Sequence, residues 1–371
     1  MIRSADGDSD PTLRMVRVLR EDGKTDPETN PSLPSELLLR MHREMCRARV
    51  LDARMVQLQR QGRIAFFGSS AGQEATPVAA GFATEPTDWV FPALRESAIM
   101  LVRGFPVAQY LAQVFGNRAD SLKGRQMPSH ISSRSVNQVS WSSVIGTQLP
   151  HAAGAAWAAK MRGDRMVAVA FLGDGATSQP DFHAAMNFAS VFRLPCVLVC
   201  QNNQWSLGMP VARQTASPTL ATKAKAYAMR GVRVDGNDVL AVYRVVSEAC
   251  GRARRGDGAT FIEAVTHRRG PATTVDDPTR RPQHADCPEW LMQDPIERLA
   301  QYLRQQGALD DVLEHTLMEE INDEISNAVA EAEKLGPPER ASLFQDVYCH
   351  SPWHLREQAQ ILLQCPAAAG R

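Results

Sequence analysis

The spacing of apolar residues along the chain predicts alternating helices and strands. Between residues 35 and 62 they recur at helical spacing, at Leu38, Met41, Met45, Leu51, Met55 and Leu58. This spacing predicts a long helix that Ser35 caps and Gly62 ends. A glycine-rich connection at 67–74 and a helix of small residues at 75–84 follow.

The centre of the chain alternates more regularly. Short apolar runs, typical of buried strands, cover residues 89–91, 166–172, 196–201, 232–234 and 260–266. Helices are expected at 150–161, at 178–191 with Ser178 as the cap, and at 239–254. This alternation predicts an α/β fold, with a doubly wound, mostly parallel sheet covered by helices on both faces.

The two ends of the chain differ from this α/β domain, which we expect to span residues 35–294. Residues 1–34 are acidic and contain prolines, and they predict a flexible N-terminal arm without the apolar core of a signal peptide. Residues 295–371 predict a helical C-terminal extension, including a helix at 313–335, and a tail rich in proline and alanine. No apolar stretch reaches the roughly 20 residues that a membrane span needs.

Composition narrows the classes of function. The 371 residues include 41 basic and 41 acidic side chains, so the formal net charge is zero. A general role at nucleic acids or membrane surfaces would need a basic excess, and we expect neither. The seven cysteines are odd in number, and Cys196 and Cys200 lie in an apolar run. A reduced, cytoplasmic protein is the simplest interpretation.

One pair of motifs carries chemistry. Gly173-Asp174-Gly175 directly follows one predicted strand, and Asn202-Asn203 directly follows the next. Either motif alone is typical of a turn or loop. In an open parallel sheet, however, neighbouring strand ends converge on the ligand crevice, and residues 176–201 have the length of one crossover between them.

These residues suit Mg²⁺ bound to a diphosphate. Mg²⁺ prefers six oxygens in octahedral geometry, often from few protein ligands and several phosphates. Asp174 supplies an anionic oxygen, Asn203 a neutral amide oxygen, and the Trp205 carbonyl a candidate third ligand. The glycines allow the backbone to approach the phosphates closely, and Arg95 supplies a positive charge after an earlier strand.

Residues 173–203 resemble the thiamine diphosphate signature. The flanking sequence resembles the alpha subunit of the decarboxylating component of 2-oxo acid dehydrogenase complexes, from about residue 35 to about residue 348. The stretches that carry this resemblance are 72–75, 123–128, 146–150 and 233–238. Two stretches are more similar to the branched-chain enzyme than to the pyruvate enzyme: Lys123-Gly124-Arg125-Gln126-Met127-Pro128 and residues 234–239. Residues 276–280, in contrast, are similar to some bacterial pyruvate enzymes.

The resemblance implies a thiamine diphosphate-binding fold and an oxidoreductase activity. That activity is the oxidative decarboxylation of branched-chain 2-oxo acids such as 3-methyl-2-oxobutanoate, followed by acyl transfer to lipoamide. The implied cofactors are thiamine diphosphate and Mg²⁺. The implied partners are a beta subunit, in a heterotetramer of two alpha and two beta chains, and a lipoyl-bearing acyltransferase core.

The resemblance also implies roles for individual residues. The metal ligands are Asp174, Asn203 and the carbonyl of Trp205. The cofactor-binding residues are Arg95, Ser143, Ile145, Asp174, Gly175, Ala176 and Asn203. A monovalent cation site matches Ser142, Thr147 and Gln148, which ordinary loop and cap hydrogen bonds explain equally well.

Two departures from the family pattern bear on activity. Relatives carry a Tyr where this chain has Leu94, and a cofactor-side His where it has Ala272. His267 and His284 lie nearby in the sequence, but neither occupies that position, so no catalytic residue is assigned. The departures leave cofactor binding intact and bear on the catalytic rate or the substrate.

Three other functions compete with this interpretation. A pyruvate or acetoin homologue would use the same chemistry with a different acyl pocket. A catalytically weak structural subunit is motivated by Leu94 and Ala272. A nicotinamide-dependent dehydrogenase is disfavoured, because no Gly-x-Gly-x-x-Gly fingerprint follows any predicted strand.

Overall fold

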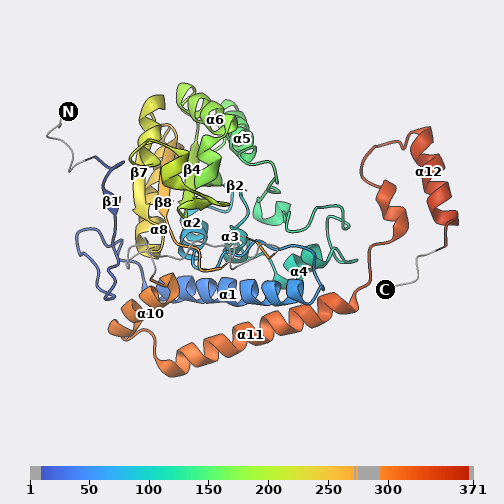
Figure 1. Ribbon diagram of the computed structural model, residues 1–371, viewed down its shortest axis with the longest axis horizontal. Coiled ribbons are helices and arrows are strands. Elements are labelled where there is room, and N and C mark those ends of the chain that lie inside the picture. The colour runs from blue at the N-terminus through green and yellow to red at the C-terminus, as the bar shows by residue number, and fades with distance from the viewer. Residues whose placement is uncertain (1–9, 271–272, 275–292, 367–371) are drawn as a thin grey trace.

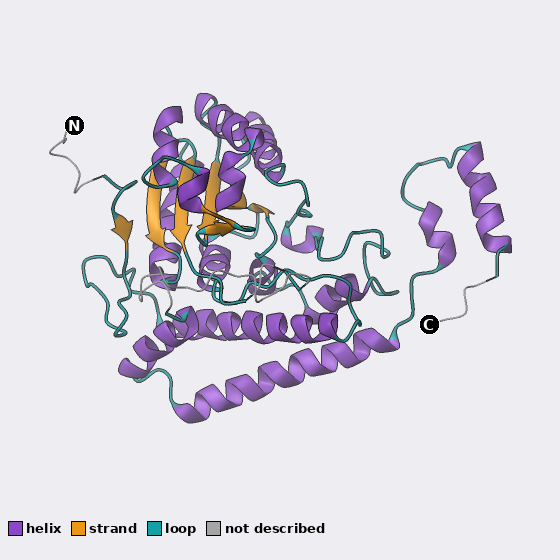
Figure 2. Cartoon of the chain, viewed as in Figure 1, coloured by secondary structure: helices purple, strands orange, loops and turns teal. Residues whose placement is uncertain are grey.

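A six-stranded parallel sheet forms the centre of the computed structural model, which describes residues 10–270, 273–274 and 293–366 (Figure 2). The spatial order is β1-β7-β8-β4-β3-β2. Every pairing is parallel. The strands are β1 (Met15–Val16), β2 (Trp89–Phe91), β3 (Ala168–Gly173), β4 (Cys196–Asn202), β7 (Arg230–Asp235) and β8 (Thr260–Val265). The predicted α/β fold with a mostly parallel sheet is confirmed.

Helices cover both faces of this sheet (Figure 1). One face is covered by α2 (Ala75–Ala83) and α8 (Val239–Arg254), which pack together. The other is covered by α5 (Gln148–Arg162) and α6 (Pro180–Val191). Alternate residues of β3 serve the two faces: Val169 and Phe171 join the core under α2 and α8, whereas Leu172 joins the core under α5 and α6. A strand buried on both faces therefore needs apolar residues at every position.

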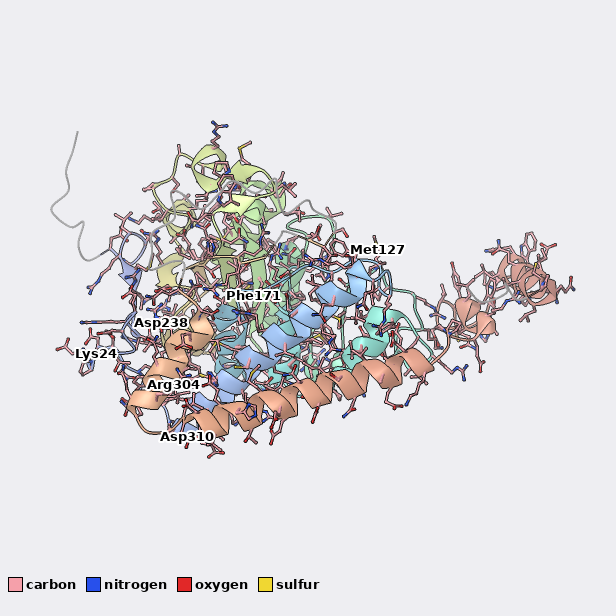
Figure 3. The ribbon with its side chains drawn as sticks, turned by 60° about the horizontal axis from the view of Figure 1, so that its bottom comes forward. Lys24, Met127, Phe171, Asp238, Arg304 and Asp310 are labelled. Atoms are coloured by element: carbon pink, nitrogen blue, oxygen red, sulfur yellow. The ribbon has the colours of Figure 1, made fainter. Side chains whose placement is uncertain are left out.

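A third layer of helices lies against the outside of α2. It contains α1 (Ser35–Arg60), α3 (Ser97–Val102), α4 (Val107–Phe115), α10 (Pro295–Gln305) and α11 (Asp311–Lys334). Figures 1 and 3 show α11 running beside α1, and Arg304 and Asp310 flank the turn between α10 and α11. Ion pairs join the two long helices: Arg43 with Glu320, Arg47 with Glu324, and Arg63, just beyond α1, with Glu333.

The remaining elements are short or peripheral. The sequence beyond α11 forms the 3-10 helix η5 (Arg340–Phe344) and α12 (Trp353–Gln364), which stand away from the sheet in Figure 1. Around the strand ends lie η1 (Arg134–Val136), η2 (Asp174–Ser178), β5 (Trp205–Ser206), β6 (Met209–Pro210), α7 (Val211–Gln214) and η3 (Ala221–Tyr227). No helix among the described residues is long and apolar enough to cross a membrane.

Two predicted N-caps are wrong, although the helices that they bound are present. Ser178 lies in η2, and Gln179 is the N-cap of α6, with no side-chain hydrogen bond to the helix. Ser35 is the first residue of α1, whose N-cap is Pro34. A proline restricts the backbone at the start of each helix, Pro34 as the N-cap of α1 and Pro180 in the first turn of α6. Each helix therefore starts without a hydroxyl cap.

The N-terminal segment also differs from the expectation of a flexible arm, because residues 10–34 are folded against the sheet edge. In β1, Met15 pairs with Arg233 and Val16 with Val234. Val18 and Leu19 that follow are only 1% exposed. A two-residue strand is too short to show a period, so this docking left no pattern in the sequence.

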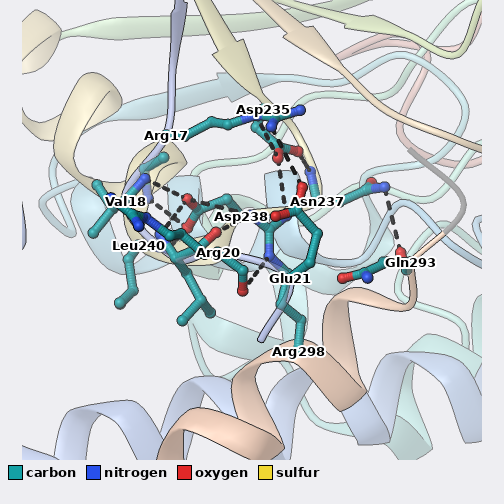
Figure 4. A network of polar contacts seen from close by, with 12 residues as sticks. Arg17, Val18, Arg20, Glu21, Asp235, Asn237, Asp238, Leu240, Gln293 and Arg298 are labelled. Carbon is teal, nitrogen blue, oxygen red and sulfur yellow. Dashed lines mark hydrogen bonds and ion pairs between the residues drawn. The ribbon is translucent and has the colours of Figure 1, made fainter. Parts of the chain in front are cut away.

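One buried carboxylate fastens this arm (Figure 4). Asp238 accepts hydrogen bonds through Oδ2 from the backbone N–H groups of Val18 and Leu19, both at 2.7 Å. Its Oδ1 caps α8 by accepting from Leu240 and Ala241, both at 3.0 Å. Burial raises the pKa of Asp238 to about 6, while Arg298 of α10 opposes this shift.

We expect Asp238→Asn to destabilise the protein by about 2–4 kcal/mol, because an amide N–H₂ group would face two buried N–H donors in place of one oxygen. Urea denaturation measures the loss, and limited proteolysis should cut between residues 14 and 20 sooner in the variant. Asp257→Asn, at an exposed site, is the matched control. An unchanged urea midpoint for Asp238→Asn would contradict this role.

The cysteines agree with a reduced protein where they are described. Cys196 and Cys200 are buried in β4, which confirms that they act as small core residues. All six described cysteines are free thiols, and Cys287 lies outside the described residues. Burial raises the pKa of Cys196 to about 12, which keeps this thiol protonated.

Candidate functional site

A cavity of about 410 Å³ lies at the carboxyl ends of β3 and β4. The register places Gly173 beside Gln201 and Asn202 beside Val265, so the loops after β3, β4 and β8 meet at one level. Every predicted site residue lines this cavity except Thr147, and except Ala272, which lies outside the described residues. The convergence expected from the motif spacing is therefore present.

Asp174 is a carboxylate of the cavity wall, which also includes Glu96. It begins η2 directly after β3 and is 2% exposed. Burial raises the pKa of its carboxyl group, and the Gln214 hydrogen bond to Oδ2 (2.9 Å), Arg268 and Arg95 oppose that shift. A carboxylate in such surroundings is stabilised by a cation that completes its coordination.

Asn203 supplies a neutral oxygen beside it. Its Nδ2 donates to Oε1 of Gln73 at 3.2 Å, which turns the carbonyl end of the amide away from Gln73. Oδ1 accepts from the backbone N–H of Trp205 at 3.3 Å and retains a second lone pair. One carboxylate, one amide oxygen and a nearby backbone carbonyl form a donor set that fits Mg²⁺ on a diphosphate.

Gly175 allows the loop after β4 to approach η2. A Cβ at this position would lie 2.1 Å from Oγ of Ser206, so any side chain would displace the β5 segment. The next residue, Ala176, is 3% exposed and packs into the core beneath the cavity. The approach of this backbone to a diphosphate stays a prediction, and in the structure the neighbour of Gly175 is the side chain of Ser206.

Two arginines bring positive charge to the cavity. Arg95 follows β2 and donates to the backbone carbonyl of Ser69. Arg268 follows β8 and is 7% exposed. Arg268 was not among the predicted site residues, although its place after a predicted strand end was a usable signal. Both guanidinium groups suit a phosphate ligand, because their planar N–H groups match its oxygens.

The glycine-rich connection is held rigidly beside these arginines. Asp52 of α1 accepts from Oγ of Ser69 at 2.7 Å and from the backbone N–H of Ser70 at 2.6 Å. Gly72 has φ +93°, and a Cβ there would lie 2.5 Å from the carbonyl oxygen of His267. This position therefore needs glycine on both conformational and steric grounds.

The side chains of the candidate monovalent cation residues make hydrogen bonds within the protein, and Gln148 bonds to a different partner from Ser142 and Thr147. Oγ of Ser142 accepts from the N–H of Val144 at 3.1 Å, and Oγ1 of Thr147 donates to the Val144 carbonyl at 3.0 Å. Gln148 points inward and donates to the carbonyl of Phe171 at 2.7 Å. The cation site stays a prediction.

Of the two departures from the family pattern, Leu94 lies among the described residues and Ala272 does not. Leu94 is half-buried in the cavity wall, and its side chain packs so closely on Gly68 that a Cβ there would lie 2.5 Å from it. Ala272 and His284 lie outside the described residues. His267 is 7% exposed and is absent from the described lining of the cavity.

Comparison with known families agrees with this geometry. A family model described as dehydrogenase E1 component matches residues 42–340. The chain belongs to this family, whose members depend on thiamine diphosphate. The family resemblance of the sequence is therefore confirmed.

Named relatives extend the match over almost the whole chain. The alpha subunit of 3-methyl-2-oxobutanoate dehydrogenase from Mycobacterium tuberculosis is 42% identical over 355 residues, which cover 94% of each chain. The 2-oxoisovalerate dehydrogenase alpha subunit of Pseudomonas aeruginosa is 37% identical, over 95% of this chain and 88% of the relative. The alpha subunit of the pyruvate dehydrogenase E1 component from Staphylococcus aureus is 36% identical, over 95% of this chain and 94% of its own.

Proposed function

We propose that this chain is the alpha subunit of a branched-chain 2-oxo acid dehydrogenase decarboxylating component. One observation carries the proposal: Asp174 and Asn203 face one cavity from the ends of neighbouring strands, next to Arg95 and Arg268. This cavity takes the diphosphate end of thiamine diphosphate together with Mg²⁺. The names of the relatives with 42% and 37% identity support a branched-chain substrate.

Each cavity residue has a role in that assignment. Asp174, Asn203 and the Trp205 carbonyl hold Mg²⁺, and Arg95 with Arg268 neutralises the diphosphate. The further cofactor contacts come from Ser143, Ile145, Gly175 and Ala176. When bound, the cofactor supplies the electron sink for decarboxylation, while the protein orients it and excludes water.

The chain works with partners in this proposal. A beta subunit completes the heterotetramer of two alpha and two beta chains, and a lipoyl-bearing acyltransferase core receives the acyl group. Val144, Ile145 and Leu207 support a covering partner, because these apolar side chains are 65%, 53% and 84% exposed at or beside the cavity. Clustered exposed apolar residues are typical of interaction surfaces.

Two alternatives each rest on a specific observation. The pyruvate dehydrogenase relative from Staphylococcus aureus, 36% identical, supports pyruvate as the substrate. Leu94 supports a catalytically weak subunit, because its side chain brings no hydrogen-bonding group to the cavity wall.

We expect the complex reconstituted with its beta subunit to prefer 3-methyl-2-oxobutanoate to pyruvate, because a hydrophobic pocket gains about 10–200-fold in kcat/KM for each added carbon it accommodates. Steady-state kinetics with both acids, in the presence of thiamine diphosphate and Mg²⁺, measures the ratio. A higher kcat/KM for pyruvate would replace the substrate assignment. Negligible turnover of both acids with intact cofactor binding would favour the weak subunit.

A further inference from the structure

A row of hydrogen-bonded polar side chains runs along the wall of the cavity. Asn203 Nδ2 donates to Oε1 of Gln73 at 3.2 Å. Gln73 Nε2 donates to Oε1 of Gln201 at 3.4 Å. Gln201 Nε2 donates in turn to Oε1 of Glu96. We call these four residues the amide relay.

The other three members of the amide relay are almost completely buried in the cavity wall. Gln73 is 0% exposed, Glu96 2% and Gln201 3%. They come from three separate segments. Gln73 precedes α2, Glu96 follows β2, and Gln201 lies near the end of β4. Because so little of these side chains is exposed, each amide finds its hydrogen-bond partners mainly within the row.

Glu96 fixes the direction of the row. Both of its carboxylate oxygens accept hydrogen bonds, Oε1 from Gln201 and Oε2 from the backbone N–H of Arg95 at 3.1 Å. An ionised carboxylate only accepts, so Gln201 must turn its N–H₂ group toward Glu96 and its carbonyl toward Gln73. The same constraint passes through Gln73 and acts together with the Trp205 N–H that donates to Asn203 Oδ1, so the Asn203 carbonyl, not its N–H₂ group, is left for a cation.

We propose that Glu96 is a positioning residue that sets the orientation of the Asn203 amide through Gln201 and Gln73. The inference rests on the proposed function, because it concerns the Mg²⁺ ligand assigned there. Reversal of the row would point the donor end of Asn203 at the metal, where a partial positive charge repels the ion.

The burial of Glu96 supports this role. Burial raises the pKa of Glu96 to about 7, which reflects the desolvation cost of its charge, whereas the hydrogen bonds from Gln201 and from the Arg95 backbone N–H favour the ionised form. A glutamine would have the same shape without that cost, yet it could donate as well as accept. The carboxylate therefore sets the direction of the hydrogen bonds, whereas a glutamine would fill the same space.

The test is Glu96→Gln in the full-length alpha chain assembled with its beta subunit. Titration calorimetry measures the Kd of Mg²⁺ at a fixed excess of thiamine diphosphate. We expect a Kd about 10–100-fold weaker than in the wild type, the range found for partners that orient metal ligands. Glu85→Gln, at an exposed position, is the matched control.

A double variant separates direction from charge alone. In Glu96→Gln with Gln201→Glu, the carboxylate moves one position along the row and accepts from both neighbours. The direction beyond it is restored, so Mg²⁺ affinity should return to within a few-fold of the wild type. Melting temperatures of the cofactor-free assemblies check folding, and if Glu96→Gln fails to fold, the double variant alone decides.

The outcomes distinguish failure of the proposed function from failure of the positioning role of Glu96. Wild-type assembly that binds no Mg²⁺ with thiamine diphosphate overturns the proposed function itself. Wild-type binding with an unchanged Kd in Glu96→Gln overturns the positioning role of Glu96. A weakened single variant that the double variant does not rescue also overturns it, because the defect then follows the charge at Glu96 and not the direction of the row.

Discussion

The Asp174→Ala variant is expected to lose Mg²⁺-dependent binding of thiamine diphosphate while retaining its fold. Asp174 is the anionic member of the assigned Mg²⁺ ligands, and alanine leaves only the neutral oxygens of Asn203 and the Trp205 carbonyl in that set. Loss of a residue that merely orients a metal ligand costs about 10–100-fold in affinity, so loss of the ligand itself should exceed 100-fold. Titration calorimetry with cofactor and Mg²⁺ measures this difference.

Stability of the cofactor-free protein gives the second half of this prediction. Because burial raises the pKa of Asp174, the charged carboxylate is unfavourable in the empty cavity. The melting temperature of Asp174→Ala without ligand should therefore equal or exceed that of the wild type. Asp164→Ala, at an exposed ion pair, controls for the loss of a carboxylate elsewhere. Unchanged cofactor affinity in Asp174→Ala would refute its assignment as a metal ligand.

The isolated chain is expected to decarboxylate 2-oxo acids negligibly. The family resemblance places the Glu that activates the pyrimidine ring of the cofactor on the beta chain. In the described part of this chain, the sequence beyond β8 builds only helices, so it supplies no second sheet for that ring. A positioned general acid or base contributes about 10²–10⁴-fold in rate, and addition of the beta chain should raise turnover by at least this factor.

Assays of the purified chain, of the beta chain and of their mixture test this dependence. An artificial electron acceptor reports decarboxylation without the acyltransferase core. The rate of the mixture should rise with the beta chain and level off at equal amounts of the two chains. Comparable turnover by the single chain and by the mixture would place the whole active site on this chain and contradict the prediction.

Much of the site was predictable because it depends on local and regular features. Continuous apolar runs identify β3 and β4, and parallel strand ends meet wherever such runs neighbour each other. The positions of Asp174 and Asn203 followed from those two facts. The amide relay was not predictable, because Gln73, Glu96 and Gln201 are far apart in sequence and join only through the packing of α2 against the sheet.

The N-terminal segment shows the opposite limit. Its composition is that of an exposed arm, and its docking depends on a few backbone N–H groups that meet the side chain of Asp238. Backbone groups are the same in every residue and leave no trace in the sequence. Asp238, some 220 positions away, thus contributes to the docking of the segment together with the pairing of β1 and the Arg298 hydrogen bond to Leu19.

The pairing of α1 with α11 has a consequence for biosynthesis. Its ion pairs join residues 270 to 277 positions apart, such as Arg63 with Glu333 and Arg47 with Glu324. The ribosome synthesises the N-terminal part first. The apolar face of α1 therefore stays uncovered by α11 until most of the chain has been translated. Met55 and Leu58, buried in the finished protein, belong to this face. The nascent chain therefore exposes an apolar surface on α1 until residue 334 has emerged. We expect chaperones to bind mainly to α1 during that interval.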